Sequence, residues 1–307
     1  TNYPWDGKNE LTIDPEKNAK FALHIRIPGW AVNQPIPGDL YVDEAKTSTL
    51  VILSLNGKPL QYRLEKGYAV LDRSWKKGDK ISLQLPMDVK RIVANENVKD
   101  DKNRFALQRG PIMYCLEGPD NKDAAVMNIV VGKDEPVQAV YKPALLNGVM
   151  TLQMKGSSAK RQVNSDELIK TVQNVVAIPY YSWANRGPGE MEVWIPFEET
   201  AAKPTPAPTI ASKSKVSGSI SNPRMLKGLS DQYDPKDSRD ASATYLHWWP
   251  KKNTMEYVQY DFDQVYTVSQ SSVYWYDDGP FGGCRIPASW KLLYKQGDQW
   301  LPVSIKG

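Results

Sequence analysis

Two carboxylates close together in the sequence are the first side chains whose types and spacing could do chemistry. Glu190 and Glu192 lie two residues apart in an extended segment, so both side chains point to one face of a strand. A glycosidase requires two carboxyl groups about 5 to 9.5 Å apart across a sugar pocket, and this pair could approach that spacing. Because carboxylates on strands are mostly exposed, we expect a solvated surface here and assign no catalytic residue to the chain.

Two isolated cysteines are the other candidates for covalent chemistry. Cys115 and Cys284 cannot form a disulfide scaffold, and with only two histidines in the sequence they show no zinc-ligand spacing. A cysteine nucleophile requires a base or a metal that lowers the pKa of its thiol. Cys115 stands between Tyr114 and Leu116 in an apolar segment, and this pattern predicts a buried core side chain.

Aromatic side chains after residue 210 are the candidates for binding a ligand. Trp and Tyr offer a flat apolar face to the C–H groups of a sugar and a polar edge for hydrogen bonds. The predicted sugar-binding side chains are His247, Trp248, Trp249 and Tyr276. Neighbouring residues of a strand point to opposite faces, so one of Trp248 and Trp249 should point inward. The alternative is that most of these rings fill the core of a small sandwich.

Composition excludes several classes of protein. The chain has 307 residues, of which 41% are hydrophobic and 24% charged, an ordinary balance for a folded protein. Its 39 basic and 35 acidic residues leave a net charge of +4, too even for an electrostatic partner of nucleic acid or of an anionic membrane. The sequence has no apolar run near the ~18 residues that a membrane-spanning helix requires. We therefore expect neither nucleic acid nor a membrane as a partner.

The elements that position these side chains are predicted to be short β-strands, because apolar residues recur at every second position. In segment 20–27 the apolar side chains that share one face are Phe21, Leu23, Ile25 and Ile27. Asn56 and Gly57 form the preferred dipeptide of a two-residue hairpin turn. Further strands are expected at 51–55, 60–64, 81–85, 105–108, 112–116, 126–131, 137–141, 149–154, 174–181, 190–197, 256–262 and, as a hairpin, 290–303. This pattern indicates an all-β chain of tandem antiparallel β-sandwiches.

Two breaks divide the chain into domains. Segment 118–123 is polar and rich in turn residues, and segment 203–209 alternates Pro with small residues, which is typical of a stiff extended linker. The predicted division is a first sandwich at 1–117, a second sandwich at 118–202, a linker at 203–209 and a third domain at 210–307.

Three segments in order carry a resemblance to a known family. Segment 3–7 reads Tyr-Pro-Trp-Asp-Gly, segment 21–31 is an alternating strand that ends in Pro-Gly-Trp-Ala, and segment 104–117 contains Leu-Gln-Arg-Gly-Pro. Together they resemble the jelly-roll-like β-sandwich region that follows the catalytic barrel in the β-L-arabinofuranosidase family, glycoside hydrolase family 127. Residues 118–200 resemble the second, immunoglobulin-like sandwich of the larger bacterial members.

The third domain resembles part of a discoidin-like (coagulation factor 5/8 type C) module. The resembling segments are 229–231, 248–250, 257–262, 273–278 and 290–294. Such modules often hold a structural Ca²⁺ in oxygen-rich loops. The predicted ligands are Asp231 and Asp234, with Asp237 and Asp240 close behind in the sequence. The ligand spacing of an EF-hand is absent and such aspartates commonly close turns, so both interpretations stay open.

The resemblance implies that the chemistry lies outside this chain. In the family, an N-terminal (α/α)₆ barrel holds a zinc-bound cysteine nucleophile from an adjacent Cys-Cys pair and a Glu that acts as acid/base. This sequence has no Cys-Cys dipeptide, and Cys115 falls in a segment whose family counterpart is structural. We therefore expect a C-terminal, non-catalytic region that docks on its own barrel, with zinc only in that barrel. The first sandwich is expected to be incomplete at its N-terminal end, and the third domain at its C-terminal end.

Three functions remain to be separated. The first is the accessory region of a secreted or periplasmic bacterial glycoside hydrolase that acts on plant polysaccharide. The second is an independent carbohydrate-binding protein that uses the aromatic third domain. The third is a purely structural or interaction module. Whether the chain catalyses any reaction by itself is left open.

Overall fold

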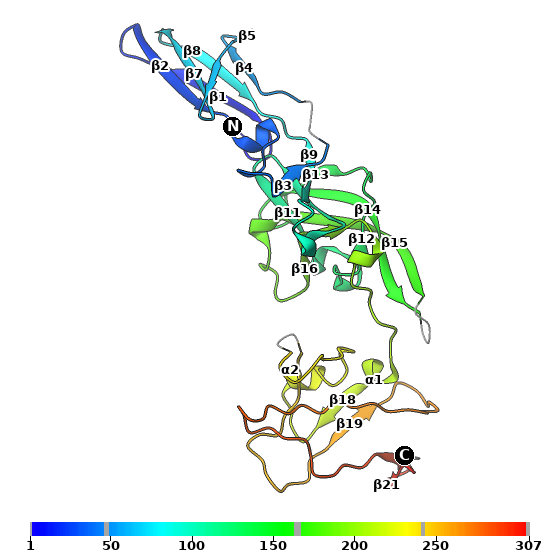
Figure 1. Cartoon of the computed structure of the whole chain (residues 1–307). Coiled ribbons are helices and arrows are strands. Elements are labelled where there is room, and N and C mark those ends of the chain that lie inside the picture. Colours follow the sequence, from blue (N-terminus) through cyan, green and yellow to red (C-terminus); the bar gives the residue numbers. More distant parts are fainter. Residues whose placement is uncertain (1, 46–48, 163–166, 241–242, 305–307) are drawn as a thin grey trace. The chain divides into compact units, whose positions relative to one another are not determined.

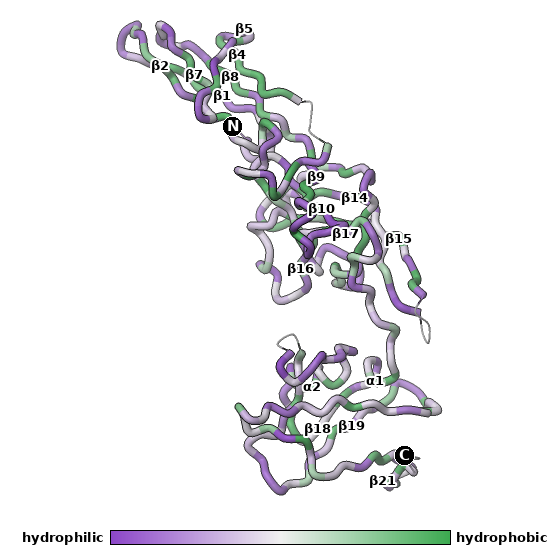
Figure 2. The backbone as a smooth tube through the Cα atoms, viewed as in Figure 1, coloured by the Kyte–Doolittle hydropathy of each residue, from purple (hydrophilic) through white to green (hydrophobic). Residues whose placement is uncertain are grey.

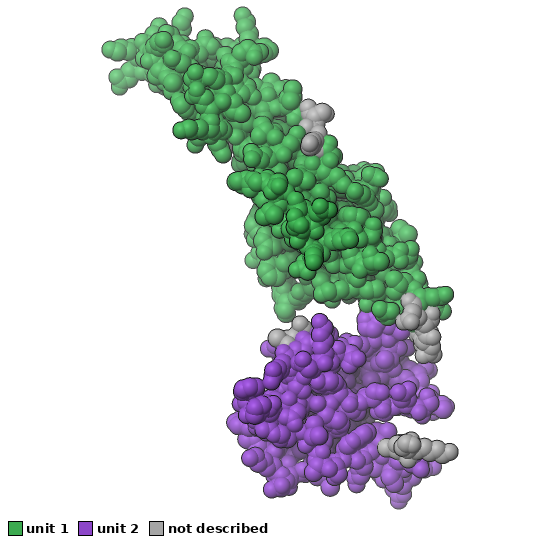
Figure 3. Space-filling model, viewed as in Figure 1, with its two compact units in different colours: residues 1–205 green, residues 206–307 purple. Residues whose placement is uncertain are grey.

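The protein is described by a computed structural model that covers residues 2–45, 49–162, 167–240 and 243–304. It divides into two compact units, residues 1–205 and residues 206–307, which are described separately (Figure 3). The described elements are mainly antiparallel strands, and the predicted all-β class with tandem sandwiches is confirmed.

The first sandwich of unit 1 is formed by two small antiparallel sheets (Figure 1). One has the order β1-β8-β4-β5 and the other β2-β7-β6. Their bounds are β1 (Lys8–Ile13), β2 (Ala19–Arg26), β4 (Ile52–Leu55), β5 (Lys58–Pro59), β6 (Arg63–Glu65), β7 (Tyr68–Trp75) and β8 (Asp79–Gln84). The apolar faces of both sheets share one core, which includes Trp75 and Ile81. The predicted alternation holds in the second half of β2, where Ile25 is buried and His24 is exposed, whereas Phe21, expected on the same buried face, is 38% exposed.

The second sandwich is built on one sheet of ten strands. Its main path is β12-β14-β15-β11-β10-β9-β3, while β13 pairs with β14, β16 with β11 and β17 with β10. The bounds are β3 (Tyr41–Asp43), β9 (Val89–Ala94), β10 (Arg104–Arg109), β11 (Ile112–Glu117), β12 (Ile129–Val130), β13 (Gln138–Lys142), β14 (Val149–Arg161), β15 (Leu168–Pro179), β16 (Met191–Glu192) and β17 (Ile195–Pro196). A second core, centred on side chains such as Phe105 and Leu152, holds these strands together.

The two cores divide unit 1 near residue 88, whereas the sequence pattern had placed the division at residue 117. The core of the first sandwich extends to Leu85, and Val89 already packs against the core of the second. Strands β9, β10 and β11 belong to the second sheet because β11 pairs with β15. The polar segment 118–123 therefore lies inside the second domain. Turn residues mark where a strand ends but not which sheet it joins.

Short helices connect the strands. The 3₁₀ turns are η1 (Gly29–Val32), η2 (Lys99–Asp101), η3 (Gly118–Asp120), η4 (Lys122–Ala124), η5 (Tyr180–Ser182) and η6 (Glu199–Ala201), and unit 2 adds α1 (Ile210–Lys213) and α2 (Pro223–Lys227). Apolar and polar stretches alternate along the chain (Figure 2). Among the described residues, no helix has both the length and the apolar character to cross a membrane.

Unit 2 contains little regular structure. β18 (Lys215–Gly218) pairs with β19 (Val258–Asp261), and β20 (Leu293–Gln296) forms the predicted hairpin with β21 (Gln299–Pro302). No described residue of this unit is buried to the degree seen in the two cores of unit 1. The discoidin-like resemblance stays a prediction, since the described strands form two separate two-stranded sheets.

The predicted linker belongs partly to unit 1. Thr205 pairs in parallel with Lys160, because its amide donates to the Ala159 carbonyl (3.1 Å) and its carbonyl accepts from the Arg161 amide (2.8 Å). Unit 2 begins at the next residue, Pro206. Alternating prolines predicted an extended segment but not that a strand would bind its first half.

Candidate functional site

Cys115 has the surroundings of a core side chain rather than of a nucleophile. Its exposed fraction is 0%, which confirms the predicted burial. Burial, together with the negative charges of Glu117 and Asp120, raises the pKa of the Cys115 thiol to about 12. Burial and Asp278 also raise the pKa of Cys284. Both thiols are therefore protonated at neutral pH, and a protonated thiol is a poor nucleophile and a poor metal ligand.

The two strand carboxylates have separate structural partners. Glu190 is exposed, and its Oε2 accepts hydrogen bonds from the amides of Val126 (2.8 Å) and Met127 (3.2 Å). Glu192, in β16, is buried, which contradicts the expected solvated surface. β16 pairs with β11, and this pairing places Glu192 inside the sandwich. The Arg104 guanidinium donates to Glu192 Oε1 at 2.7 Å. These contacts hold loops and strands together and do not form an acid/base pair.

The environment of Glu192 shifts its proton equilibrium. Burial raises the pKa of the carboxyl to about 7, although the positive charge of Arg104 acts in the opposite direction. Glu192 Oε2 has no hydrogen-bond partner among the described residues. Arg104 also donates to the Trp194 carbonyl (2.9 Å) and to the Ala201 carbonyl, so it ties the segment after β16 to β10.

A second buried ionic cluster, which the sequence analysis missed, supports the loop between β15 and β16. Arg186 donates to both carboxylates of Glu117 and Asp120, and Glu117 is almost fully buried. These hydrogen bonds raise the pKa of the Arg186 guanidinium, so the charge is permanent. Glu117 also accepts from the Ala184 amide (2.9 Å), which fixes the loop between β15 and β16. A lone Arg in a polar loop was the sole sequence signal, and its partners lie more than 60 residues earlier.

The three segments that carry the family resemblance meet at the contact between the two sandwiches. Arg109, at the end of β10, donates to the Trp5 carbonyl at 2.9 Å. Trp30 lies in the first core, and its carbonyl accepts from the buried Lys90 ammonium at 2.9 Å. Gly110 has φ +57°, and a Cβ there would stand 2.7 Å from the Met87 sulfur. These residue types are therefore explained by close packing between the domains.

The predicted sugar-binding side chains fall into two groups in unit 2. Tyr276 stacks on Tyr245 with ring centroids 3.9 Å apart, and His247 lies 6.1 Å from the same Tyr245 ring. Trp248 points inward and donates through Nε1 to Ser219 Oγ at 3.1 Å. Trp249 has an exposed fraction of 59%. One side chain of the tryptophan pair thus points inward, as expected, while sugar binding itself stays a prediction.

The predicted calcium ligands mostly close local turns. Asp231 accepts from the Tyr233 amide (2.9 Å), and Asp237 accepts from the Arg239 amide (2.7 Å). Across the described ranges, no three His, Cys, Asp or Glu side chains are grouped so that they could hold a metal ion. The zinc that the family resemblance implies belongs to the catalytic barrel and stays a prediction about that domain. Structural calcium at Asp231 and Asp234 remains a prediction.

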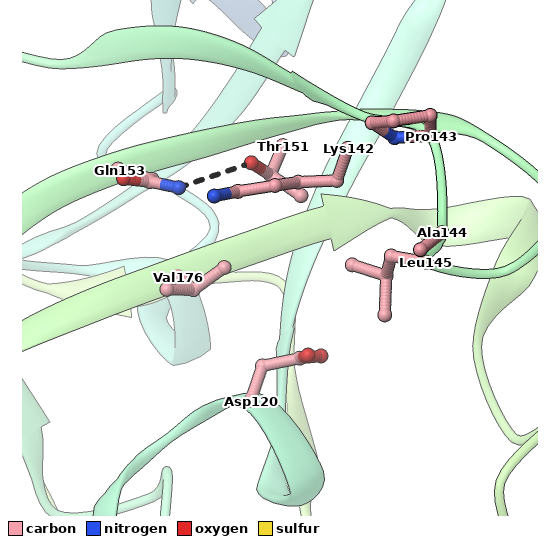
Figure 4. A pocket seen from close by; sticks show the side chains of 8 residues that line it. All are labelled: Asp120, Lys142, Pro143, Ala144, Leu145, Thr151, Gln153 and Val176. Atoms are coloured by element: carbon pink, nitrogen blue, oxygen red, sulfur yellow. Dashed lines mark hydrogen bonds between the residues drawn. The ribbon is translucent and has the colours of Figure 1, made fainter.

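An open groove on the second sandwich is one hollow in which a small molecule could lie. It has a volume of about 470 Å³ and lies over β13, β14 and β15 (Figure 4). Asp120 lines it on one side and Lys142 on the other, with Val176 between them. A second, more polar hollow of about 350 Å³ is lined by the loops around Lys99 and Thr200.

The fold defines a class of protein with tandem antiparallel β-sandwich domains. Residues 1–87 match the family model described as the beta-L-arabinofuranosidase, GH127 middle domain. Residues 89–196 match the glycoside hydrolase family 127 C-terminal domain. The chain therefore belongs to glycoside hydrolase family 127, and the family boundary agrees with the two cores.

Relatives of this chain are longer proteins. A non-reducing end beta-L-arabinofuranosidase of Bifidobacterium longum is 32% identical over 211 residues, which are 63% of this chain and 29% of that protein. A solved GH127 beta-arabinofuranosidase is 34% identical with a TM-score of 0.64, covering 67% of this chain and 32% of its own. A GH127 beta-L-arabinofuranosidase of Geobacillus stearothermophilus is 36% identical with a TM-score of 0.55, covering 64% and 29%. The chain thus spans about a third or less of the relatives it matches.

Proposed function

We propose that this chain is the non-catalytic accessory region of a glycoside hydrolase that cleaves β-L-arabinofuranosides. On this proposal the two sandwiches of unit 1 support a catalytic barrel that belongs to the same protein. The observation that carries the proposal is the state of Cys115, which is fully buried with a thiol pKa of about 12. A nucleophile in that state has no thiolate and no access to substrate.

The surface of the first sandwich supports a docking role. Several large apolar side chains between residues 32 and 52 are exposed: Val32, Leu40, Leu50 and Ile52. Exposed apolar groups of this kind are common at contacts between domains. The relatives are more than twice as long as the matched region, which leaves room for the barrel that the family resemblance implies.

The accessory role is tested by activity measurements on an aryl β-L-arabinofuranoside. We expect no turnover by residues 1–307 alone and turnover by the longer protein that contains them. In that longer protein, Cys115→Ala should leave kcat within about twofold, because the thiol is remote from chemistry, while lowering stability by a few kcal/mol at most. Turnover by the isolated chain that is lost in Cys115→Ala would overturn the proposal.

A second candidate function is carbohydrate binding by unit 2, either as part of the enzyme or as an independent module. Its support is the exposed Trp249 ring and the stacked Tyr245–Tyr276 pair. Exposed tryptophan and tyrosine rings suit the apolar face of a sugar. A discoidin-like fold with a structural calcium would fit this function. If unit 2 binds no glycan, a purely structural role is favoured.

The proposed location of the protein follows from its proposed substrate. Plant polysaccharide is too large to enter a cell, so a secreted or periplasmic location in a bacterium is part of the proposal. The bacterial sources of two relatives agree with it.

A further inference from the structure

The groove on the second sandwich has a floor built from one face of three paired strands. Leu152 of β14 belongs to the core, so its neighbours Thr151 and Gln153 project to the opposite face of the sheet. In the register, Gln153 lies opposite Val176 of β15, and Thr151 lies opposite Val140 of β13. The floor therefore rests on the second sheet and presents the apolar Val176 beside the Gln153 carboxamide.

Two walls close the groove along its sides. Residues 143–145 form a turn after β13 on one side, and η3 with Asp120 forms the other (Figure 4). Asn121 ties this second wall to β15, since its Nδ2 donates to the Val176 carbonyl (3.1 Å) and its Oδ1 accepts from the Val176 amide (3.0 Å). Arg186 holds Asp120 from behind. The walls are thus fixed before any ligand arrives, which reduces the entropy cost of binding.

The side chains around the groove combine three kinds of contact. Lys142 and the Gln153 amide supply donors, and Asp120 and the Gln153 oxygen supply acceptors. Val176 and Leu145 supply apolar surface between them (Figure 4). Lys142 is exposed and takes part in no ion pair within the described ranges, so its ammonium is available. The groove is open to solvent, so a ligand would lie along it rather than be enclosed.

This combination selects among ligand classes. The charged side chains that line the groove are Asp120 and Lys142, one of each sign, so a polyanion or a polycation would meet a like charge on one side. A purely apolar ligand would remove water from Lys142 and Asp120 without replacing their hydrogen bonds, which is costly. A sugar offers hydroxyl groups that both donate and accept, together with a C–H face that fits Val176. We propose that this groove is a binding site for a neutral oligosaccharide, separate from the aromatic side chains of unit 2.

The test is calorimetry of residues 1–307 with a neutral arabino-oligosaccharide and with an oligogalacturonate of equal length. The site variant is Lys142→Met combined with Gln153→Leu, and the matched control is Lys58→Met, an exposed lysine on β5. We expect binding of the neutral probe, at least tenfold weaker binding in the site variant, and an unchanged affinity in the control. Circular dichroism of each variant shows whether the fold is retained.

Three outcomes would overturn the inference: no binding of the neutral probe at millimolar concentration, equal affinity in the site variant, or tighter binding of the oligogalacturonate. Trp249→Ala in the same experiment separates this site from unit 2. Binding that is lost in Trp249→Ala and kept in the site variant assigns the sugar to unit 2 instead. The inference does not depend on the barrel, so a catalytically active chain would leave it standing.

Discussion

The buried carboxyl of Glu192 makes the stability of unit 1 fall as the pH rises. Its pKa in the folded chain is about 7, above the ordinary value of 4.5. Between these two pH values the folded state binds more protons than the unfolded state, so the free energy of unfolding decreases with increasing pH. Between pH 5 and pH 8 we expect the parent chain to lose about 1–3 kcal/mol more of its free energy of unfolding than Glu192→Gln loses.

Urea unfolding of both proteins at pH 5 and pH 8, followed by circular dichroism, measures this effect. Glu16→Gln, on an exposed carboxylate of the same unit, is the control and should follow the parent chain. The same loss of stability in Glu192→Gln and in the parent chain would show that another group titrates in this range.

At the scale of single residues, the sequence predicted burial where the cause was local. Cys115 lies among apolar neighbours, and its burial follows from that segment alone. Glu192 alternates with apolar residues as a solvated side chain would, but its partner Arg104 lies 88 residues earlier. The Arg186 cluster has the same origin in distant contacts. A single sequence carries no signal for ion pairs between distant residues, because neither residue type identifies its partner.

At the scale of elements, β3 joins the two sandwiches. It lies within the first 87 residues, yet it pairs with β9 of the second sheet. Asp43 of β3 forms a buried ion pair with Lys90 of β9 at 3.2 Å. The Lys90 ammonium also donates to the Trp30 carbonyl and to Asn33 Oδ1 (2.7 Å), both from the η1 region of the first sandwich. One ammonium therefore connects three elements.

Lys90→Met should be severely destabilising. The substitution leaves the Asp43 carboxylate buried without its counter-charge, and breaking a buried pair in this way costs about 3–5 kcal/mol. Asp43→Asn added to Lys90→Met should restore part of the loss, because no uncompensated charge remains. Lys80→Met, on an exposed lysine of β8, is the control. Urea midpoints of the three variants measure the effect, and a loss below about 1 kcal/mol for Lys90→Met would contradict it.

The sequence predicted some strands, such as β2 and the turn at Asn56 and Gly57, because the period-two pattern is local. It missed β1, β3, β7, β9 and β18, and the segment expected at 60–64 contributes β6, which pairs with β7 rather than with β4. The domain boundary could not be predicted from this local pattern. The residues of β10 form a buried run that fits either sheet. Its place in the second sheet follows from the pairing of its neighbour β11 with β15, which tertiary packing sets. Sequence periodicity thus predicted part of the strands, and packing determined the sheets.

At the scale of the whole molecule, the two units differ in how much apolar surface they bury. Unit 1 has two cores of buried side chains, whereas none of the described residues of unit 2 reaches that burial, and Val265 and Phe281 are almost fully exposed. Local stability follows the number of buried apolar contacts. We expect amides of β10 and β14 to exchange hydrogen orders of magnitude more slowly than amides of β19 and β20.

Hydrogen exchange of the full chain, read by mass spectrometry of peptides, tests this difference. Peptides from β1 and β8 serve as an internal control, because the first sandwich has a core of its own and should be protected like the second. Adding the neutral oligosaccharide should further slow exchange near residues 142–153 only if the groove binds it. Protection of β19 and β20 equal to that of β14 would mean that unit 2 is as stable as unit 1 despite its exposed apolar side chains, and the burial argument would fail.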